Sequence, residues 1–120
     1  PRSVPGIVYG LHHYADVSSD MLEWHGHNDF YHGVTNAVNA WLYGCSSVNC
    51  SLLGIGERTG NIPLEAMVFE YASLKGTFDG MDPTAITDIA KYFSKPWRNG
   101  NAFWQSAKFI SVFCLQHTKP

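Results

Sequence analysis

The sequence lacks the features that define several large classes of protein. It has only eight lysine and arginine residues against ten acidic residues, and the basic residues are scattered with no run of three. Nucleic-acid binding depends on clustered basic side chains that face phosphates, so the sequence predicts no nucleic-acid partner. No apolar stretch approaches the roughly 20 residues of a membrane-spanning helix, so no membrane partner is predicted. No basic segment followed by an apolar run marks a signal peptide near the start.

Cysteine is also scarce. Cys45, Cys50 and Cys114 make an odd number, and none of them belongs to a C-x-x-C pair. This usage is typical of a reduced, cytoplasmic protein in which each thiol serves as a small buried apolar group. With 45% hydrophobic and 15% charged residues, the composition is that of a single globular domain or a part of one. The chain begins at Pro1 rather than Met, so we expect the natural start to lie upstream.

Hydrophobic periodicity predicts alternating helices and strands. Apolar residues at helical spacing begin near Ser3 and Tyr31, and again after two N-cap candidates, Asn61 and Asp82. Gly44, Gly76 and Pro96 are expected to end three of these helices. Strand-like segments at about 21–29 and 46–56 lie between them. The order helix, strand, helix, strand, helix, helix predicts right-handed βαβ connections and a parallel sheet in an α/β fold. Residues 97–120 have no clean period, and their apolar core around 109–115 is compatible with either a strand or a helix.

The segment "EWHGHNDFYH", residues 23–32, holds the first group of residues suited to chemistry. Alternate strand residues share a face, so Glu23, His25, His27 and Asp29 are expected to point the same way. Two neutral imidazoles at this spacing can bind one divalent metal ion. Asp29 could be a third ligand, a support for a histidine, or a helix cap. His32 lies in the next helical turn and is expected to be a bystander. The alternative is a pair of histidines that only form hydrogen bonds at a strand end.

The segment "GIGERTGN", residues 54–61, is the second such group. Its glycine spacing misses the dinucleotide fingerprint by one position, and no G-K-[ST] follows to make a phosphate loop. Glu57 and Arg58 are expected in a flexible loop at the carboxyl end of a strand, where parallel α/β proteins place their active sites. The alternative is a glycine turn that carries a surface ion pair.

Together the two motifs resemble the metal-dependent acyl-CoA Claisen and aldol enzymes built on a TIM barrel. This family includes isopropylmalate, homocitrate and Re-type citrate synthases and the hydroxymethylglutaryl-CoA lyases. The strings "EWHGHNDF", "AWLYGC" and "GIGERTGNIPLEAM" are most similar to homocitrate synthase-like and Re-citrate synthase sequences. The resemblance extends from about Arg2 to Phe93. One departure is Leu53, where isopropylmalate synthases usually have Asn, and this disfavours isopropylmalate synthase itself.

The resemblance implies a fold and a set of site residues. Residues 1–80 would form about the last two βα units of a (β/α)8 barrel, 81–96 a helix after the barrel, and 97–120 an unassigned tail. His25, His27 and Asn61 match the positions that bind or adjoin the metal. Asn28 and Asp29 would support these ligands, and Glu57 and Arg58 would lie next to the reacting groups as catalytic residues.

The resemblance also implies the chemistry. A divalent ion (Mg, Mn, Zn or Co) would polarise the carbonyl of a 2-oxo acid, and acetyl-CoA would be the co-substrate of a condensation that forms a citrate-type or homocitrate-type 2-hydroxy acid. The parent enzyme would be a homodimer. The family's first-strand motif, D-x-x-L-R-[DE]-G, does not occur in this sequence, and His117 is a poor match to its catalytic histidine after the barrel. The chain is therefore expected to be a fragment that is inactive by itself.

Two other interpretations compete with this one. The pattern H-x-H-x-D also opens a metallo-hydrolase motif, although Phe30 here replaces the histidine that normally follows the aspartate. A non-catalytic truncated module is the third possibility, and the missing first-strand motif favours it.

Overall fold

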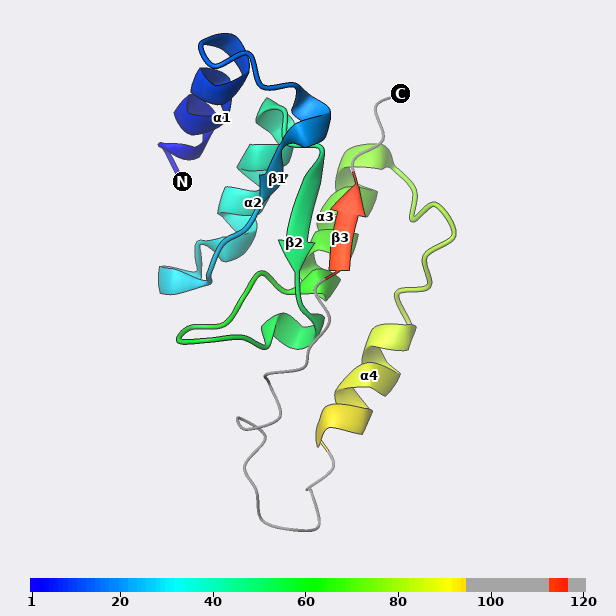
Figure 1. The fold of residues 1–120 in the computed structure, drawn as a ribbon. Coiled ribbons are helices and arrows are strands. Elements are labelled where there is room, and N and C mark those ends of the chain that lie inside the picture. The colour runs from blue at the N-terminus through cyan, green and yellow to red at the C-terminus, as the bar shows by residue number, and fades with distance from the viewer. Residues whose placement is uncertain (95–112, 117–120) are drawn as a thin grey trace.

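The computed structural model describes residues 1–94 and 113–116 of the chain (Figure 1). Three subjects of the sequence predictions lie outside these ranges: the helix end expected at Pro96, the residue His117, and most of the tail. Within them no helix is long and apolar enough to cross a membrane. The predicted order of helices and strands is confirmed. The elements in chain order are α1 (Val4–His13), β1 (Glu23–Trp24), α2 (Gly33–Tyr43), β2 (Ser47–Cys50), α3 (Leu64–Lys75), α4 (Ala85–Ser94) and β3 (Phe113–Gln116), with short 3-10 turns at Ser19–Met21, Asp29–Tyr31 and Leu52–Gly54.

The sheet has the strand order β1-β2-β3. β1 and β2 pair in parallel, with Glu23 opposite Ser47, as the βαβ pattern predicts. β3 pairs with the other edge of β2 in the antiparallel direction, with Cys50 opposite Phe113 and Ser47 opposite Gln116. The tail therefore contributes a strand at 113–116, where the sequence pattern left strand and helix open.

The first predicted strand is much shorter than its pattern suggested. β1 ends at Trp24, and beyond it His27 forms an isolated bridge with Asn61. Asp29 begins a 3-10 turn in which Phe30 and Tyr31 have positive φ values of 51° and 61°. The prediction that Asp29 continues the strand face of the histidines is therefore wrong, because the chain turns away before it reaches Asp29.

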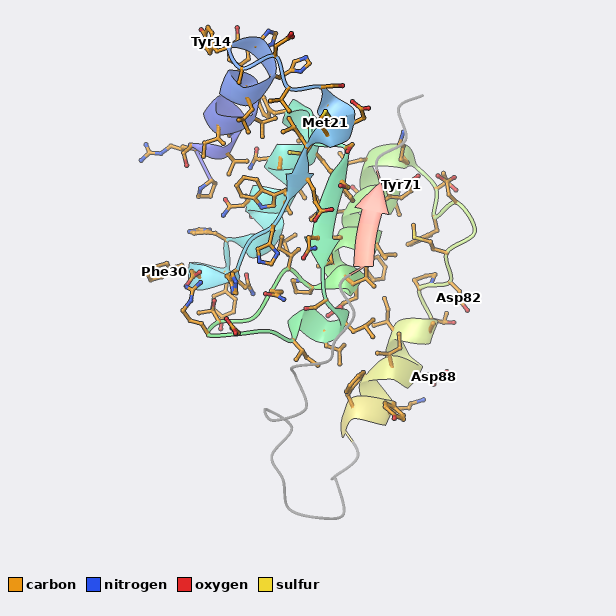
Figure 2. All side chains as sticks on the ribbon, viewed as in Figure 1. Tyr14, Met21, Phe30, Tyr71, Asp82 and Asp88 are labelled. Atoms are coloured by element: carbon orange, nitrogen blue, oxygen red, sulfur yellow. The ribbon has the colours of Figure 1, made fainter. Side chains whose placement is uncertain are left out.

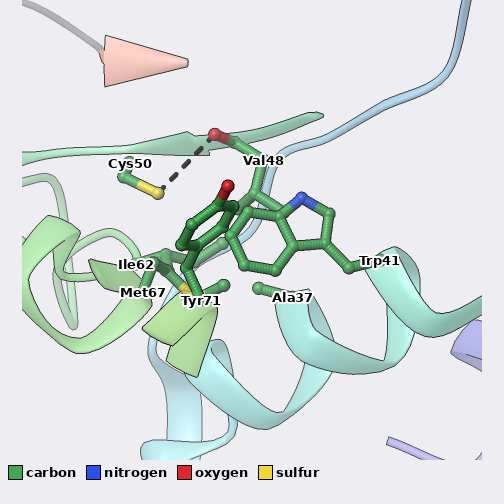
Figure 3. Packing of buried hydrophobic residues seen from close by; sticks show 7 residues of the cluster. All are labelled: Ala37, Trp41, Val48, Cys50, Ile62, Met67 and Tyr71. Atoms are coloured by element: carbon green, nitrogen blue, oxygen red, sulfur yellow. Dashed lines mark hydrogen bonds between the residues drawn. The ribbon is translucent and has the colours of Figure 1, made fainter. Parts of the chain in front are cut away.

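Helices α2 and α3 cover one face of the sheet and bury the main core. Trp41 and Tyr71 meet edge to face, with ring centroids 6.3 Å apart, beside Val48 of β2 (Figure 3). Such aromatic pairs add to the free energy gained by burying their area. The buried members of this cluster are Ala37, Trp41, Val48, Cys50, Ile62, Met67 and Tyr71.

A second cluster joins α1 to α2. Val4 and Val8 are buried against Ala40 and Cys45. Ile7 is 50% exposed, so only part of the predicted apolar stripe of α1 faces the protein. Cys45 and Cys50 are buried, as predicted, and burial raises the pKa of the Cys45 thiol.

The helix ends follow the expected capping residues with one exception. Gly44 ends α2 and Gly76 ends α3, both at positive φ, as predicted. Asp82 accepts hydrogen bonds from the backbone N–H of Thr84 at 2.9 Å and from its hydroxyl at 2.6 Å just before α4. The prediction that Asn61 caps α3 is wrong, because Pro63 occupies the N-cap position.

Candidate active site at the carboxyl ends of β1 and β2

Because β1 and β2 are parallel, their carboxyl ends open onto the same edge of the sheet, and the two sequence motifs meet there. The His27–Asn61 bridge joins the segment after β1 to the segment after β2. The backbone N–H of Asn28 donates to the carbonyl of Gly60 at 2.9 Å and strengthens this connection. Residues about 30 positions apart in sequence are thus held side by side by main-chain contacts.

The two histidines of the H-x-H motif lie next to each other. The ring centroids of His25 and His27 are 5.4 Å apart, and the rings are nearly perpendicular, at 82°. His25 is exposed and His27 is partly buried. The prediction that both imidazoles share one side is confirmed by this contact, even though the strand itself ends before them.

Hydrogen bonds at Nδ1 determine which ring nitrogen can bind a metal ion. His27 Nδ1 donates to the backbone carbonyl of Glu57 at 3.3 Å, and His25 Nδ1 donates to Asn49 Oδ1 at 2.9 Å. A carbonyl oxygen can only accept, so in the neutral ring the proton belongs to Nδ1 and the lone pair to Nε2. Metal-binding histidines in proteins are oriented in this way.

The glycines of the second motif make room for Asn61. A Cβ atom on Gly56 would lie 2.6 Å from Asn61 Cγ, so the side chain of Asn61 rests directly on the backbone of Gly56. Gly60 has a φ of +88°, and a Cβ there would lie 2.4 Å from the carbonyl oxygen of Gly54. A side chain at position 56 would therefore displace the amide of Asn61, and one at position 60 would force the backbone of the loop to shift.

Asp29 and Arg58 connect the two loops through an ion pair. The guanidinium of Arg58 donates to the carboxylate of Asp29, and this hydrogen bond lowers the pKa of Asp29. Both side chains remain well exposed, at 58% for Arg58 and 39% for Asp29. The alternative interpretation of this loop included a surface ion pair. Such a pair is present, and Arg58 forms it with Asp29. Phe30, next to Asp29, extends into solvent at 89% exposure (Figure 2).

The remaining predicted residues have separate positions. Asn28 Oδ1 accepts from the backbone N–H of Gly33 at 3.1 Å and so stabilises the start of α2. Glu57 is exposed, and it is its carbonyl oxygen that contacts His27. His32 is exposed at the N-cap position of α2. The hydrogen bonds described for His25 and His27 go to Asn49 and Glu57 and do not involve His32.

The described residues offer an incomplete ligand set for a metal ion. Among residues 1–94 and 113–116, no group of three His, Cys, Asp or Glu side chains could hold an ion. The interpretation of Asp29 as a third ligand is therefore not supported. Two imidazoles with Nε2 presented, on a segment that is bridged to Asn61, fit a divalent cation as part of a larger set of ligands.

Asn49 is the site residue that the sequence analysis missed. It lies in β2 between Val48 and Cys50, which face the core, so its side chain is on the other face with His25. Asparagine is unfavourable within strands, and its alternation with buried residues was the available signal.

A family model described as HMGL-like matches residues 1–92. The chain belongs to the HMGL-like family. The resemblance drawn from the two motifs is thereby confirmed, and with it an α/β fold of this family. The metallo-hydrolase interpretation loses its basis.

Several curated proteins are similar to this chain. It is 61% identical over 95 residues to a "Citrate (Re)-synthase" of Clostridium kluyveri, which covers 79% of this chain and 21% of that protein. It is 55% identical over 93 residues to a "Citrate (Re)-synthase" of Syntrophus aciditrophicus, and this match covers 78% of this chain and 15% of that protein. A "Homocitrate synthase 1" of Nostoc is 36% identical over 70 residues, covering 58% and 19%. The chain thus spans about a fifth or less of these relatives' length. No solved structure matches it.

Proposed function

We propose that this chain carries the two-histidine half of the metal site of a Re-citrate synthase-like acyltransferase. The observation that carries the proposal is the pair His25 and His27, whose Nδ1 atoms donate to Asn49 Oδ1 in β2 and to the carbonyl of Glu57 in the G-x-G-E-R loop. The identity of 61% to a "Citrate (Re)-synthase" supports the reaction class. The reaction would join the acetyl group of acetyl-CoA to the keto carbon of oxaloacetate, with thioester hydrolysis to citrate and free CoA.

The proposal includes the position of the chain in a larger fold. Helices α2 and α3 cover one face of the β1–β2 pair (Figure 1). The other face carries polar side chains such as Asn49 and Glu23, which contact each other there. In a (β/α)8 barrel the helices lie outside and the active site opens at the carboxyl ends of the strands. This arrangement suits residues 1–80 as the last two βα units of a barrel.

The donor atoms fit a divalent cation. His25 and His27 would bind it through Nε2, and Asn61 would place an amide oxygen beside them. When bound, the cation would act as a Lewis acid on the keto oxygen of the substrate. Arg58 lies at the same edge of the sheet as the two histidines and forms an ion pair with Asp29. In this position its guanidinium would orient an anionic substrate. Glu57 lies in the same loop and is a candidate general acid or base next to the reacting groups.

A segment exchange tests the proposed function. Residues 1–92 of this chain replace the matching segment in the Clostridium kluyveri relative, and CoA release is followed with acetyl-CoA and either oxaloacetate or 2-oxoglutarate. We expect turnover with oxaloacetate and a loss of at least about 100-fold when His25→Ala is added to the chimera, because metal ligands contribute directly to rate. His12→Ala, on α1, is the matched control.

The outcomes of this experiment separate the interpretations. A folded chimera without turnover, or one in which His25→Ala keeps full turnover, contradicts the proposal. Preference for 2-oxoglutarate would instead place the chain with the homocitrate-forming enzymes. The 120-residue chain alone is expected to release no CoA, because the described residues contain only part of a ligand set.

A further inference from the structure

A second layer of polar residues stands behind His25. Val48 and Cys50 of β2 are buried in the core beneath α2 and α3. Strand alternation therefore places Asn49 on the opposite, open face of the sheet. Glu23 of β1 lies opposite Ser47, two residues before Asn49, and it is exposed. Strand period groups Glu23 with the histidines, and no role in the proposed function uses it.

These side chains form a continuous hydrogen-bonded row. Asn49 Nδ2 donates to Glu23 Oε1 at 3.2 Å, and Asn49 Oδ1 accepts from His25 Nδ1 at 2.9 Å. A carboxylate can only accept, so the carboxylate of Glu23 selects the NH2 end of the Asn49 amide. The oxygen end of the same amide is then turned toward His25. The row has a defined direction from Glu23 through Asn49 to the imidazole.

We infer that Glu23 and Asn49 are positioning residues that hold His25 with its proton on Nδ1 and its Nε2 lone pair toward the metal position. The inference rests on the proposed function for the identity of the ligand, a divalent cation. The tautomer itself follows from the hydrogen bonds of the chain and does not depend on that function. Neither side chain would touch substrate or metal, so their effect would be indirect.

The two histidines differ in how this orientation is achieved. His27 donates to the backbone carbonyl of Glu57, which no side-chain substitution removes. His25 is exposed and depends on the amide of Asn49. His27 is therefore an internal reference for any change made at Asn49.

The test is a long-range 1H–15N correlation spectrum of the imidazole rings in the 15N-labelled, metal-free 120-residue chain. The pH is chosen so that the rings are neutral. The unchanged chain should show Nδ1–H rings for His25 and His27. Asn49→Leu should move His25 to a mixture of both tautomers and leave His27 as it was. Glu23→Gln keeps an acceptor for the Asn49 amide and should largely preserve the Nδ1–H form.

Zn²⁺ titration by calorimetry is the second readout. Loss of a residue that orients a metal ligand typically weakens metal binding by about 10-fold to 100-fold, and we expect Asn49→Leu to fall in that range. Asn39→Leu is the matched control, because it removes an asparagine on α2 whose amide donates to the carbonyl of Thr35 in the same helix. Glu23→Leu replaces Asn49→Leu as the test variant if the latter fails to fold.

The outcomes distinguish this inference from the proposed function. An Nε2–H ring for His25 in the unchanged chain overturns the inference, and so does an unchanged tautomer in Asn49→Leu. If the tautomer shifts as expected but His25→Ala keeps full turnover in the chimera, the positioning role stands and the proposed metal site fails.

Discussion

Replacing Gly60 by alanine should destabilise the loop 54–61, which connects the two parts of the candidate site. Gly60 has a φ of +88°, and a Cβ there would lie 2.4 Å from the carbonyl oxygen of Gly54. That oxygen accepts a hydrogen bond from the backbone N–H of Asn61 at 3.0 Å, and the carbonyl of Gly60 accepts one from Asn28. The added methyl group must therefore push Gly60 and Gly54 apart within the second loop, and Gly60 is the residue that connects this loop to Asn28.

General values for each contribution give the size of this effect. A left-handed conformation costs an L-residue about 1–2 kcal/mol relative to glycine. The carbonyl of Gly54 must also move away, which forfeits a hydrogen bond with a net value of about 1 kcal/mol. The lower entropy of the unfolded chain returns about 0.4–1 kcal/mol. The free energy of unfolding of Gly60→Ala should fall by about 2 kcal/mol, or roughly 1 M in the urea midpoint for a small domain.

Urea unfolding followed by tryptophan fluorescence measures this change, with Gly6→Ala as the matched control. Gly6 lies in α1, and nothing lies within 4 Å of the position of its added Cβ. Glycine within a helix costs roughly 0.5–1 kcal/mol relative to alanine, so the control should be unchanged or slightly stabilised. A Gly60→Ala variant as stable as the control would refute the assigned loop conformation.

Three further predictions concern the same region and α4. Gly56→Ala should weaken Zn²⁺ binding by about 10-fold, because the new methyl group displaces the Asn61 amide from its position on the loop. Arg58→Gln should raise the pKa of Asp29, measured by NMR titration of its carboxyl, because the lowered pKa arises first from the Arg58 hydrogen bond. Asp82→Ala should lower the free energy of unfolding by about 1 kcal/mol in urea titration, because it removes the cap of α4.

The sign of the Asp29 effect follows from linkage. The pKa of Asp29 is lowered in the folded state, so its pairing with Arg58 stabilises the fold above the unfolded pKa of about 3.9. This stability is lost as the pH falls through the folded pKa. If the pKa of Asp29 does not change in Arg58→Gln, the pairing of Asp29 with Arg58 is contradicted. If the Zn²⁺ affinity does not change in Gly56→Ala, the position of the Asn61 amide against Gly56 is contradicted. Stability unaffected by Asp82→Ala would show that α4 does not depend on this cap.

Local patterns predicted much of the fold because their causes are local. Gly44 and Gly76 end helices through positive φ values that other residues adopt at a cost. Trp41 and Tyr71 fall on the apolar stripes of α2 and α3 and are buried where those stripes meet the sheet. The shared side of His25 and His27 followed from strand period.

The parts that sequence could not predict depend on contacts between distant segments. Asp29 begins a 3-10 turn instead of continuing the strand, and its ion-pair partner, Arg58, lies 29 residues away. Asn61 does not cap α3, because it bridges His27 and rests on Gly56. Asn49 becomes a partner of His25 only after β1 and β2 pair in register. The period of a segment indicates which of its residues share a face, but it does not name their partners on a distant segment, so none of these contacts could be read from it.

The pairing of β3 bears directly on how the proposed barrel could form. β2 pairs in parallel with β1 on one edge and in the antiparallel direction with β3 on the other. The residues of β3, 113–116, lie beyond the 1–92 segment that matches the family. In a (β/α)8 barrel every strand has a parallel neighbour on both edges. The backbone groups of Ser47–Cys50 on the second edge can pair with one strand at a time, so β3 and a parallel neighbour exclude each other. A barrel that completes the ligand set around His25 and His27 on this edge must therefore first release β3 from β2.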